Sequence, residues 1–243
     1  KFNLNAGGKL SLQIIPIFYL IVFENLYLTN LGSYNFITVE LGTFSIPFTL
    51  VCVLFLINAF NYFDGMDGTL SFTTISTLGM LFFLLPDHIF RLYLITIILP
   101  ICVFLFFNFS LFKLPKIFLG DSGSLLLGFI VSFLLIYLAK RNFVHPILLA
   151  WTTTIFVYEF LSINITRIKK KQNLFKAGKD HLHHILKKKT KSVLFSNLII
   201  LMLNVILFAI GYATFNIISP IFSLISFIFL FFIFFNIRTK YLI

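Results

Sequence analysis

Eight apolar stretches, each close to the length that crosses a lipid bilayer, dominate this sequence of 243 residues. A helix needs about 20 mostly apolar residues to cross the hydrocarbon layer. The stretches are approximately residues 10–29, 44–62, 69–86, 90–108, 122–139, 145–165, 193–213 and 217–236. None carries enough polar residues for a water-facing stripe, so we expect spans and not surface helices. The sequence predicts an all-α polytopic membrane protein with about eight transmembrane helices in a single domain, residues 1–243.

The composition excludes a soluble or a disordered chain. Hydrophobic residues make up 59% of the sequence and charged residues 11%, whereas soluble domains contain roughly 25% charged residues. The formal net charge is +11, which on a soluble chain would suggest a nucleic-acid partner. Here the basic residues lie mostly in short loops, so we expect a lipid bilayer and no nucleic acid as the partner. Cys52 and Cys102 lie inside apolar stretches, and neither is typical of a disulfide framework or a metal site.

The basic residues also predict the orientation in the membrane. When the loops are assigned alternately to two sides, 16 Lys and Arg residues fall on one side and 3 on the other. Positive charge is retained on the cytoplasmic side of bacterial inner membranes, so we expect the richer side to be cytoplasmic. Asp64, Asp67, Asp121 and Asp180 all fall on that side. Residues 31–42 contain Gly, Ser, Thr and Tyr and predict an extended or hairpin loop outside.

The first polar motif lies at the end of the second stretch. Asn58, Asn61 and Asp64 are three residues apart, which puts them on one helix face. Polar groups at such a position usually line a cavity. Asp64 and Asp67 are each followed by a glycine, which permits a sharp turn and close approach of a ligand. This spacing places Asp64 and Asp67 as paired carboxylates at the membrane surface. Helix capping is the alternative explanation for these residues.

The second motif consists of Asn108 and the segment Lys113-Leu-Pro-Lys-Ile-Phe118-Leu-Gly-Asp121-Ser-Gly-Ser124, which leads directly into a span. A serine can cap the helix that begins here, and the free N–H groups of a helix N-terminus bind phosphate oxygens. Asp121 at the same place suits a hard cation such as Mg²⁺, which could bridge the carboxylate and a diphosphate. An ordinary loop with a capped helix is the alternative.

The third motif begins with Arg167 and three lysines and ends in His181-Leu-His183-His184. A basic run beside a membrane is usually a headgroup or orientation signal. Three histidines could bind zinc, but the neighbouring lysines oppose a cation and no cysteine partner is near. Contact with an anionic phosphate or with a sugar is favoured, and an acid/base role stays open because histidine titrates near pH 7.

With these motifs in order, the sequence resembles the polyprenyl-phosphate N-acetylhexosamine-1-phosphate transferases, the membrane family that includes MraY and WecA. Residues 58–68 resemble the family's NxxNxxDGxDG element. Asn108 with residues 118–124 matches its N…FMGDxGS element, and residues 181–184 resemble the HLHH of the WecA branch. The resemblance implies transfer of a sugar 1-phosphate from a UDP-N-acetylhexosamine, with UDP-GlcNAc the favoured donor, to undecaprenyl phosphate. UMP and a lipid diphosphate-sugar are the implied products, at the start of a cell-envelope polysaccharide.

The resemblance also implies site residues. The implied catalytic residues are Asp64, Asp67, Asp121 and His183. The implied substrate-binding residues are Asn58, Asn61, Gly65, Met66, Asn108, Phe118, Arg167, Lys179, His181 and His184. Asp121 would bind Mg²⁺ (or Mn²⁺), with Asp67 as a second ligand or a nucleotide contact.

Further roles follow from the same resemblance. Phe118 and Asn108 would hold the uracil, and Asp64 would organise the site or assist deprotonation. The histidines and Arg167 would contact phosphate or the amino sugar. The implied location is the bacterial cytoplasmic membrane with the active site on the cytoplasmic face, and a homodimer is left open.

The sequence departs from the family pattern at four places. Relatives carry an Asp-Asp pair just upstream of a segment like residues 1–13, so we expect a longer protein with that pair and two or three further spans. Gly178 and Lys179 stand where an acid and an arginine are usual, and Glu159 stands where an intramembrane Asp is common. Two alternatives remain. A transporter or flippase would use Glu24 and Glu159 as pathway acids, and a non-catalytic homologue would lack the Asp-Asp pair.

Overall fold

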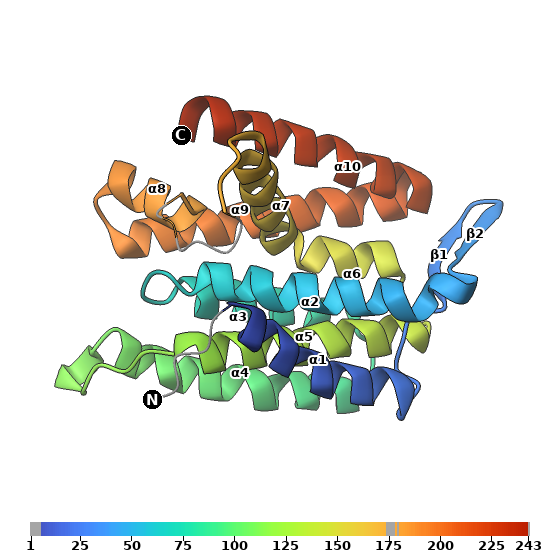
Figure 1. The fold of residues 1–243 in the computed structure, drawn as a ribbon, viewed down its shortest axis with the longest axis horizontal. Coiled ribbons are helices and arrows are strands. Elements are labelled where there is room, and N and C mark those ends of the chain that lie inside the picture. The colour runs from blue at the N-terminus through green and yellow to red at the C-terminus, as the bar shows by residue number, and fades with distance from the viewer. Residues whose placement is uncertain (1–5, 174–177, 179, 243) are drawn as a thin grey trace.

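The computed structural model describes residues 6–173, 178 and 180–242. The elements of these residues are α1 (Ala6–Val22), β1 (Asn30–Tyr34), β2 (Ile37–Glu40), α2 (Ser45–Phe63), α3 (Thr69–Leu84), α4 (His88–Asn108), α5 (Gly120–Lys140), α6 (Pro146–Thr152), α7 (Thr154–Lys169), α8 (Leu182–Thr190), α9 (Val193–Ala213) and α10 (Pro220–Ile237), with short helical turns at Gly42–Phe44, Leu111–Lys113, Thr214–Ile218 and Arg238–Leu242. Most helices lie roughly side by side, with the hairpin at one end and α8 at the other (Figure 1).

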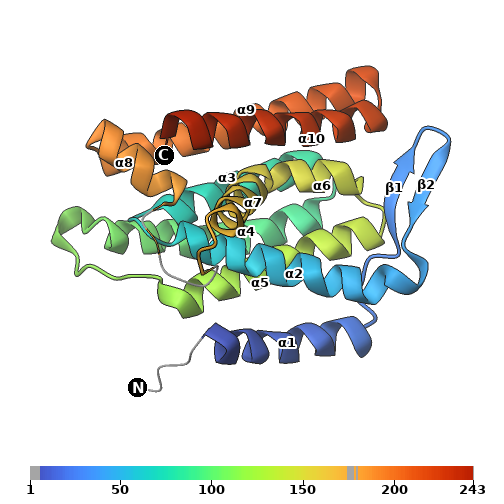
Figure 2. The ribbon, with the colours of Figure 1, turned by 45° about the horizontal axis from the view of Figure 1, so that its top comes forward.

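The expected all-α polytopic membrane protein is confirmed, but the count of eight spans is not. Within the described residues, five helices are long and apolar enough to cross a membrane, or six if α6 and α7 form one bent span. Each of the eight expected stretches overlaps a helix, but α1 and α3 are too short for this criterion. Figure 2 shows α1 along one side of the bundle and α9 and α10 along the opposite side.

The expected single helix over residues 145–165 is wrong, because the chain breaks into α6 and α7 with a bend of 75°. Three consecutive threonines, Thr152, Thr153 and Thr154, occupy the break. Their hydroxyls donate to carbonyls of the preceding turn, a local bonding pattern that bends helices. The carbonyl of Thr152 accepts from the Thr77 hydroxyl of α3. The freed backbone is thus satisfied inside the bundle, as a bilayer requires.

The hairpin expected at residues 31–42 is confirmed as β1 and β2. The strands pair antiparallel, with Ser33 opposite Thr38 and Tyr34 opposite Ile37. Asn35 has a positive φ of 54° at the turn, a conformation that asparagine tolerates well. His145, at the start of α6, contacts the Ser33 carbonyl through Nε2 at 3.1 Å. The hairpin is therefore fastened to the end of the bundle opposite α8.

The packing of α2 against α5 carries the central part of the core. Gly128 of α5 lies so close to α2 that a Cβ there would be 2.8 Å from Cα of Ile57 and 3.1 Å from Cβ of Phe60. Small residues allow such close helix approach in membrane proteins. The spacing between α2 and α5 fixes the relative positions of the motifs at the ends of these two helices.

We expect Gly128→Ala to destabilise the fold by about 1–3 kcal/mol, because the new methyl group overlaps backbone that cannot move away easily. Thermal unfolding in detergent measures the change. Gly79→Ala is the matched control, since no atom lies within 4 Å of a Cβ at that position in α3. The control should raise stability slightly, because alanine favours helix over glycine. Equal unfolding temperatures for both variants would contradict the close α2–α5 contact.

Candidate active site

The three sequence motifs meet at the end of the bundle that carries α8 (Figure 1). The end of α2 contacts the start of α5 through Asn61 and Asp121. The start of α3 contacts the end of α4 through Gly68 and Asn108. The hairpin lies at the other end. Segments up to about 120 residues apart therefore share one face, as the alternating loops predict.

Two asparagine amides hold the loop between α2 and α3. The Asn108 Oδ1 atom accepts from the Gly68 N–H at 2.8 Å, and Gly68 has a positive φ of 73°. The Asn197 Nδ2 atom, from α9, donates to the Asp67 carbonyl at 2.8 Å. The Asn197 Oδ1 atom accepts from the Thr69 hydroxyl at 2.7 Å. Both asparagines are nearly fully buried, so the loop has a fixed shape before any ligand arrives.

Asn108 also fixes the second motif. Its Nδ2 atom donates to the Ile117 carbonyl at 2.9 Å, so its one side chain bonds the backbones of both motif loops. The side chain is 4% exposed. The structure gives Asn108 the part of a positioning residue, and a contact with uracil stays a prediction.

Asp64 and Asp121 form a pair of neighbouring carboxylates. Asp64 follows the last turn of α2, and Asp121 lies in the first turn of α5. Burial and the negative charge of Asp121 raise the pKa of Asp64 to about 6, although the Gly120 N–H donates to it. The Asn61 Nδ2 atom donates to Asp121 Oδ1 at 3.3 Å and to Ser124 Oγ at 2.9 Å. Asn61 thus fixes one carboxylate relative to α2.

Asp67 has a different environment from the other two acids. Its Oδ2 atom lies 2.7 Å from Nζ of Lys116 in a partly exposed ion pair. The same Nζ atom lies 5.1 Å from the ring centroid of Phe118. Phe118 is 71% exposed, and the Lys116 ammonium lies over one face of its ring. The positive charge of Lys116 therefore offsets the negative charge of Asp67.

A cavity of about 200 Å³ lies between these loops. Its lining residues are Asp64, Gly65, Met66, Asp67, Gly68, Leu70, Ser71, Phe104, Asn108, Phe118, Leu119 and Gly120. Met66 is buried at 9% exposure. Six of the predicted site residues therefore line one cavity, which mixes carboxylates with apolar and aromatic surface.

The acids fit a hard divalent cation only in part. Within the described ranges, no three His, Cys, Asp or Glu side chains converge as a metal shell. Mg²⁺ is commonly held by one or two carboxylates, with water and substrate phosphate as the other ligands. The Asp64–Asp121 pair meets that requirement, because a cation between two repelling carboxylates would lower their mutual repulsion. The predicted ligand pair, Asp121 with Asp67, stays a prediction; Asp67 is paired with Lys116, whereas Asp121 is the charged neighbour of Asp64.

The histidines of α8 pack against the first motif. His183 is 1% exposed, and its ring stacks parallel to that of His181 at a centroid distance of 5.5 Å. The His184 ring lies 4.2 Å from His183. A Cβ on Gly65 would lie 2.3 Å from Nε2 of His183. Only glycine at position 65 allows the histidine to lie this close to the loop.

Burial keeps the two inner histidines neutral. Desolvation is the first cause for both and outweighs the charge of Asp180, which raises the pKa of His181, so the pKa of His181 falls to about 4 and that of His183 to about 2. Among the described residues, His181 Nδ1 and His183 Nε2 are buried without a hydrogen-bond partner. The sequence predicted anion contact through this cluster. The histidine cluster offers neutral imidazoles, and each neutral ring has one nitrogen that donates and one that accepts a hydrogen bond.

Arg167 is paired within the protein. Its guanidinium donates to both Asp180 oxygens, at 2.9 and 3.2 Å. Burial alone would raise the pKa of Asp180, but Arg167 holds it below its ordinary value. A Cβ at Gly178 would lie 2.1 Å from Asp180 and 2.7 Å from Arg167, so this ion pair fills the space of a side chain at position 178. That explains why glycine stands there. Lys179 lies outside the described residues.

Asn58 is used elsewhere. Its Nδ2 atom donates to the Leu54 carbonyl at 2.7 Å and to the Gln13 side chain of α1 at 3.4 Å. The side chain thus links α1 with α2, and its substrate contact stays a prediction.

Four residues of this end were absent from the predicted site: Lys116, Glu159, Asn197 and Arg238. Asn197 and Glu159 carry a recognisable signal, because a polar side chain inside an apolar stretch usually has a specific partner. Lys116 lies within the second motif but was considered only as nearby charge. Arg238 was counted only for orientation, and its partner lies 79 residues away.

This fold defines a class of protein: an integral membrane protein with a polar site at one end of a helical bundle. Residues 1–139 match the family described as glycosyl transferase family 4. The chain therefore belongs to that family.

Three curated relatives are similar to most of the chain. An undecaprenyl-phosphate alpha-N-acetylglucosaminyl 1-phosphate transferase of Escherichia coli O157:H7 is 29% identical over 194 residues, which cover 76% of this chain and 53% of the relative. The corresponding protein of Yersinia pestis is 27% identical with the same coverage. A probable undecaprenyl-phosphate N-acetylglucosaminyl 1-phosphate transferase of Bacillus subtilis is 31% identical, over 76% of this chain and 52% of the relative. The chain spans about half the length of the curated relatives it matches.

We expect Gly65→Ala to displace His183 from the loop, because the added methyl group overlaps its Nε2 atom. Histidine modification by diethylpyrocarbonate, read by mass spectrometry, measures the change. His183 should be protected in the parent protein and react at least about tenfold faster in the variant, since it would be released into solvent. Gly79→Ala is the control and should leave the rate unchanged. Equal protection of His183 in all three proteins would contradict the contact.

Proposed function

We propose that the complete protein transfers N-acetylhexosamine 1-phosphate from a UDP-N-acetylhexosamine to undecaprenyl phosphate. The products are UMP and a lipid diphosphate-sugar, which starts a cell-envelope polysaccharide. Family membership and the names of the relatives support this reaction, and those names favour UDP-N-acetylglucosamine as the donor. The observation that carries the proposal is the proximity of Asp64, which follows α2, to Asp121 in the first turn of α5.

The reaction joins two anions. An oxygen of the lipid phosphate attacks the sugar-linked phosphorus of the UDP-sugar, a new P–O bond forms, and the bond to UMP breaks. Preorganised charge at the reacting phosphates is the main way to lower such a barrier. Lys116 supplies a cation next to Asp67, and the N-terminus of α5 supplies N–H groups that favour phosphate oxygens.

Asp64 suits proton exchange with the acceptor. Its pKa of about 6 is close to the second pKa of a phosphate monoester, which is about 6. Before a cation binds, a proton can therefore pass from the lipid phosphate to Asp64 with little change in free energy, whereas a cation held by Asp64 would lower this pKa. The neutral imidazoles of His181 and His183 add hydrogen bonds to phosphate or sugar without adding charge that would compete for the acids.

The proposed cofactor is Mg²⁺ (or Mn²⁺), held by Asp121 and Asp64. When bound, the ion would neutralise diphosphate charge and polarise the P–O bond that breaks. Asn61 would keep Asp121 in place for this role, through its bonds to Asp121 and Ser124.

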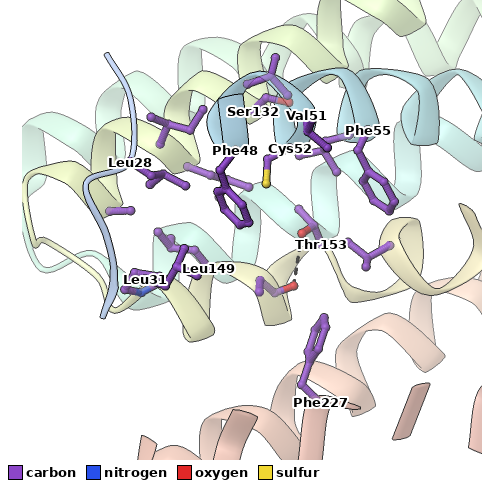
Figure 3. A pocket seen from close by; sticks show the side chains of 18 residues that line it. Leu28, Leu31, Phe48, Val51, Cys52, Phe55, Ser132, Leu149, Thr153 and Phe227 are labelled. Atoms are coloured by element: carbon purple, nitrogen blue, oxygen red, sulfur yellow. Dashed lines mark hydrogen bonds between the residues drawn. The ribbon is translucent and has the colours of Figure 1, made fainter. Parts of the chain in front are cut away.

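Apolar cavities between the helices suit the prenyl chain. One of about 460 Å³ runs from Asp121 and Ser122 past Leu125 and Phe129 of α5, facing α1. Another apolar cavity, also of about 460 Å³, lies between α2, α5 and α6. In Figure 3, Phe48, Cys52 and Phe55 of α2 face this second cavity together with Leu149 of α6. We propose that the groove at Asp121 takes the first isoprene units, because it places the lipid phosphate beside the acid pair.

A transporter is less well supported. Glu159 forms a buried ion pair with Arg238, and Glu24 is exposed, so these two acids lie in unlike surroundings and define no common path.

We expect Asp121→Asn in the complete protein to lower turnover at least about a hundredfold, or about 2.7 kcal/mol of barrier, because asparagine lacks the charge that a hard cation prefers. Release of UMP from UDP-GlcNAc, at several Mg²⁺ concentrations, measures it. Asp87→Asn is the matched control. Asp87 caps α4 by accepting from the Ile89 N–H, and asparagine caps equally well. Near-parental turnover in Asp121→Asn, with unchanged Mg²⁺ dependence, would reduce Asp121 to a helix cap.

We also propose that the α8 end faces the cytoplasm, on the basis of the lysine and arginine distribution. Single cysteines at Phe36 and Lys188, in a background without Cys52 and Cys102, test this orientation. Both positions are exposed, at the hairpin tip and in α8 respectively. A membrane-impermeant maleimide should label position 36 in intact cells and position 188 only after permeabilisation. The reverse pattern would overturn the proposed orientation.

A further inference from the structure

A buried ion pair joins α7 to the end of α10. The Arg238 Nε atom lies 2.8 Å from Oε2 of Glu159, and its Nη2 atom lies 3.1 Å from Oε1. Each side chain is 1% exposed. Burying two charges is costly, and replacing such a pair by apolar residues is often neutral or stabilising. Stability alone is therefore a weak explanation for this pair.

The same two side chains hold the backbone on both sides of His181. The Leu182 N–H, at the start of α8, donates to Oε1 of Glu159 at 2.7 Å. The Arg238 guanidinium donates to the Asp180 carbonyl. A carboxylate at a helix N-terminus is also favoured by the helix dipole. The backbone is thus held at residues 180 and 182, on either side of His181.

Arg167 adds a third restraint to the same place through its two bonds to the Asp180 carboxylate. The restrained segment leads directly into His183, which lies against Gly65 of the first motif. The position of the imidazoles in the site therefore depends on a contact with α10, whereas the match to the family covers only residues 1–139.

We propose that Glu159 and Arg238 are positioning residues, whose buried ion pair fixes the backbone around His181 so that the imidazole of His183 lies against Gly65 of the first motif. The consequence for catalysis rests on the proposed transferase function, but the structural part does not. An ion pair that merely anchors α10 to α7 would not restrain α8.

Hydrogen exchange of the complete protein in detergent tests the structural part. The double variant Glu159→Leu/Arg238→Met removes both charges together, so that no unpaired buried charge remains. Amides of α8 should exchange at least about tenfold faster in this variant, while those of α9 keep the parental rate. Ser223→Ala is the control. It removes the hydroxyl that accepts from Trp151 Nε1 and loosens α10 at a distance from α8, so α8 exchange should not change.

Two exchange results would overturn the proposal. One is an α8 rate that equals that of the parent protein in the double variant. The other is an equal acceleration in α8 and α9, which would indicate general loosening. Arg238→Lys keeps the charge but loses the planar guanidinium that bonds both Glu159 and the Asp180 carbonyl, and should give intermediate protection.

Turnover tests the catalytic part. In the double variant, kcat should fall at least about tenfold with the KM for UDP-GlcNAc changed less than about threefold, and Arg238→Lys should recover part of kcat. Faster α8 exchange with parental kcat would overturn the positioning role. If the parent protein itself transfers no sugar phosphate, the proposed function fails, whereas the exchange result still decides whether the ion pair fixes α8.

Discussion

The buried amide of Asn108 is the contact on which the arrangement of the site depends. Backbone groups that leave a helix near the bilayer have little water to bond to, and each unsatisfied group is costly. Asn108 satisfies one N–H in the loop after α2 and one carbonyl in the loop before α5. Its donor and acceptor ends thus hold both acidic loops at a fixed separation. The close α2–α5 packing at Gly128 then places the helix ends that carry the acids.

Three acidic residues at the α8 end form ion pairs with basic residues. Asp67, Asp180 and Glu159 each have a cationic partner in Lys116, Arg167 and Arg238, respectively. Burial, and then the negative charge of nearby Asp121, raise the pKa of Asp64. Neutral histidines lie beside the same loop. A cation bound beside Asp64 and Asp121 would lower their mutual repulsion, which is the electrostatic basis of the proposed cation site.

Much of the fold followed from the sequence, because apolar length and hydrogen-bond satisfaction in lipid leave few choices. The hairpin of residues 31–42 and the gathering of the motifs at one end were both predicted. The break between α6 and α7 was not, since hydropathy does not sense that three threonine hydroxyls bond back to their own helix. The count of eight spans is not confirmed for a similar reason, because apolar composition does not show that, among the described residues, α1 and α3 are shorter than a full span.

The sequence by itself determined the class of protein, the motifs and their position at one end of the bundle, because these depend on composition and on the order of residues along the chain. Only the tertiary structure decided which charged residue lies next to each of the acids. Asp67 takes Lys116 as its partner, and Asp64 becomes the neighbour of Asp121 from 57 positions away. It also decided that Arg238 supports the histidine segment. Such pairings depend on how helices that are distant in the sequence pack together, and no local sequence pattern determines that packing.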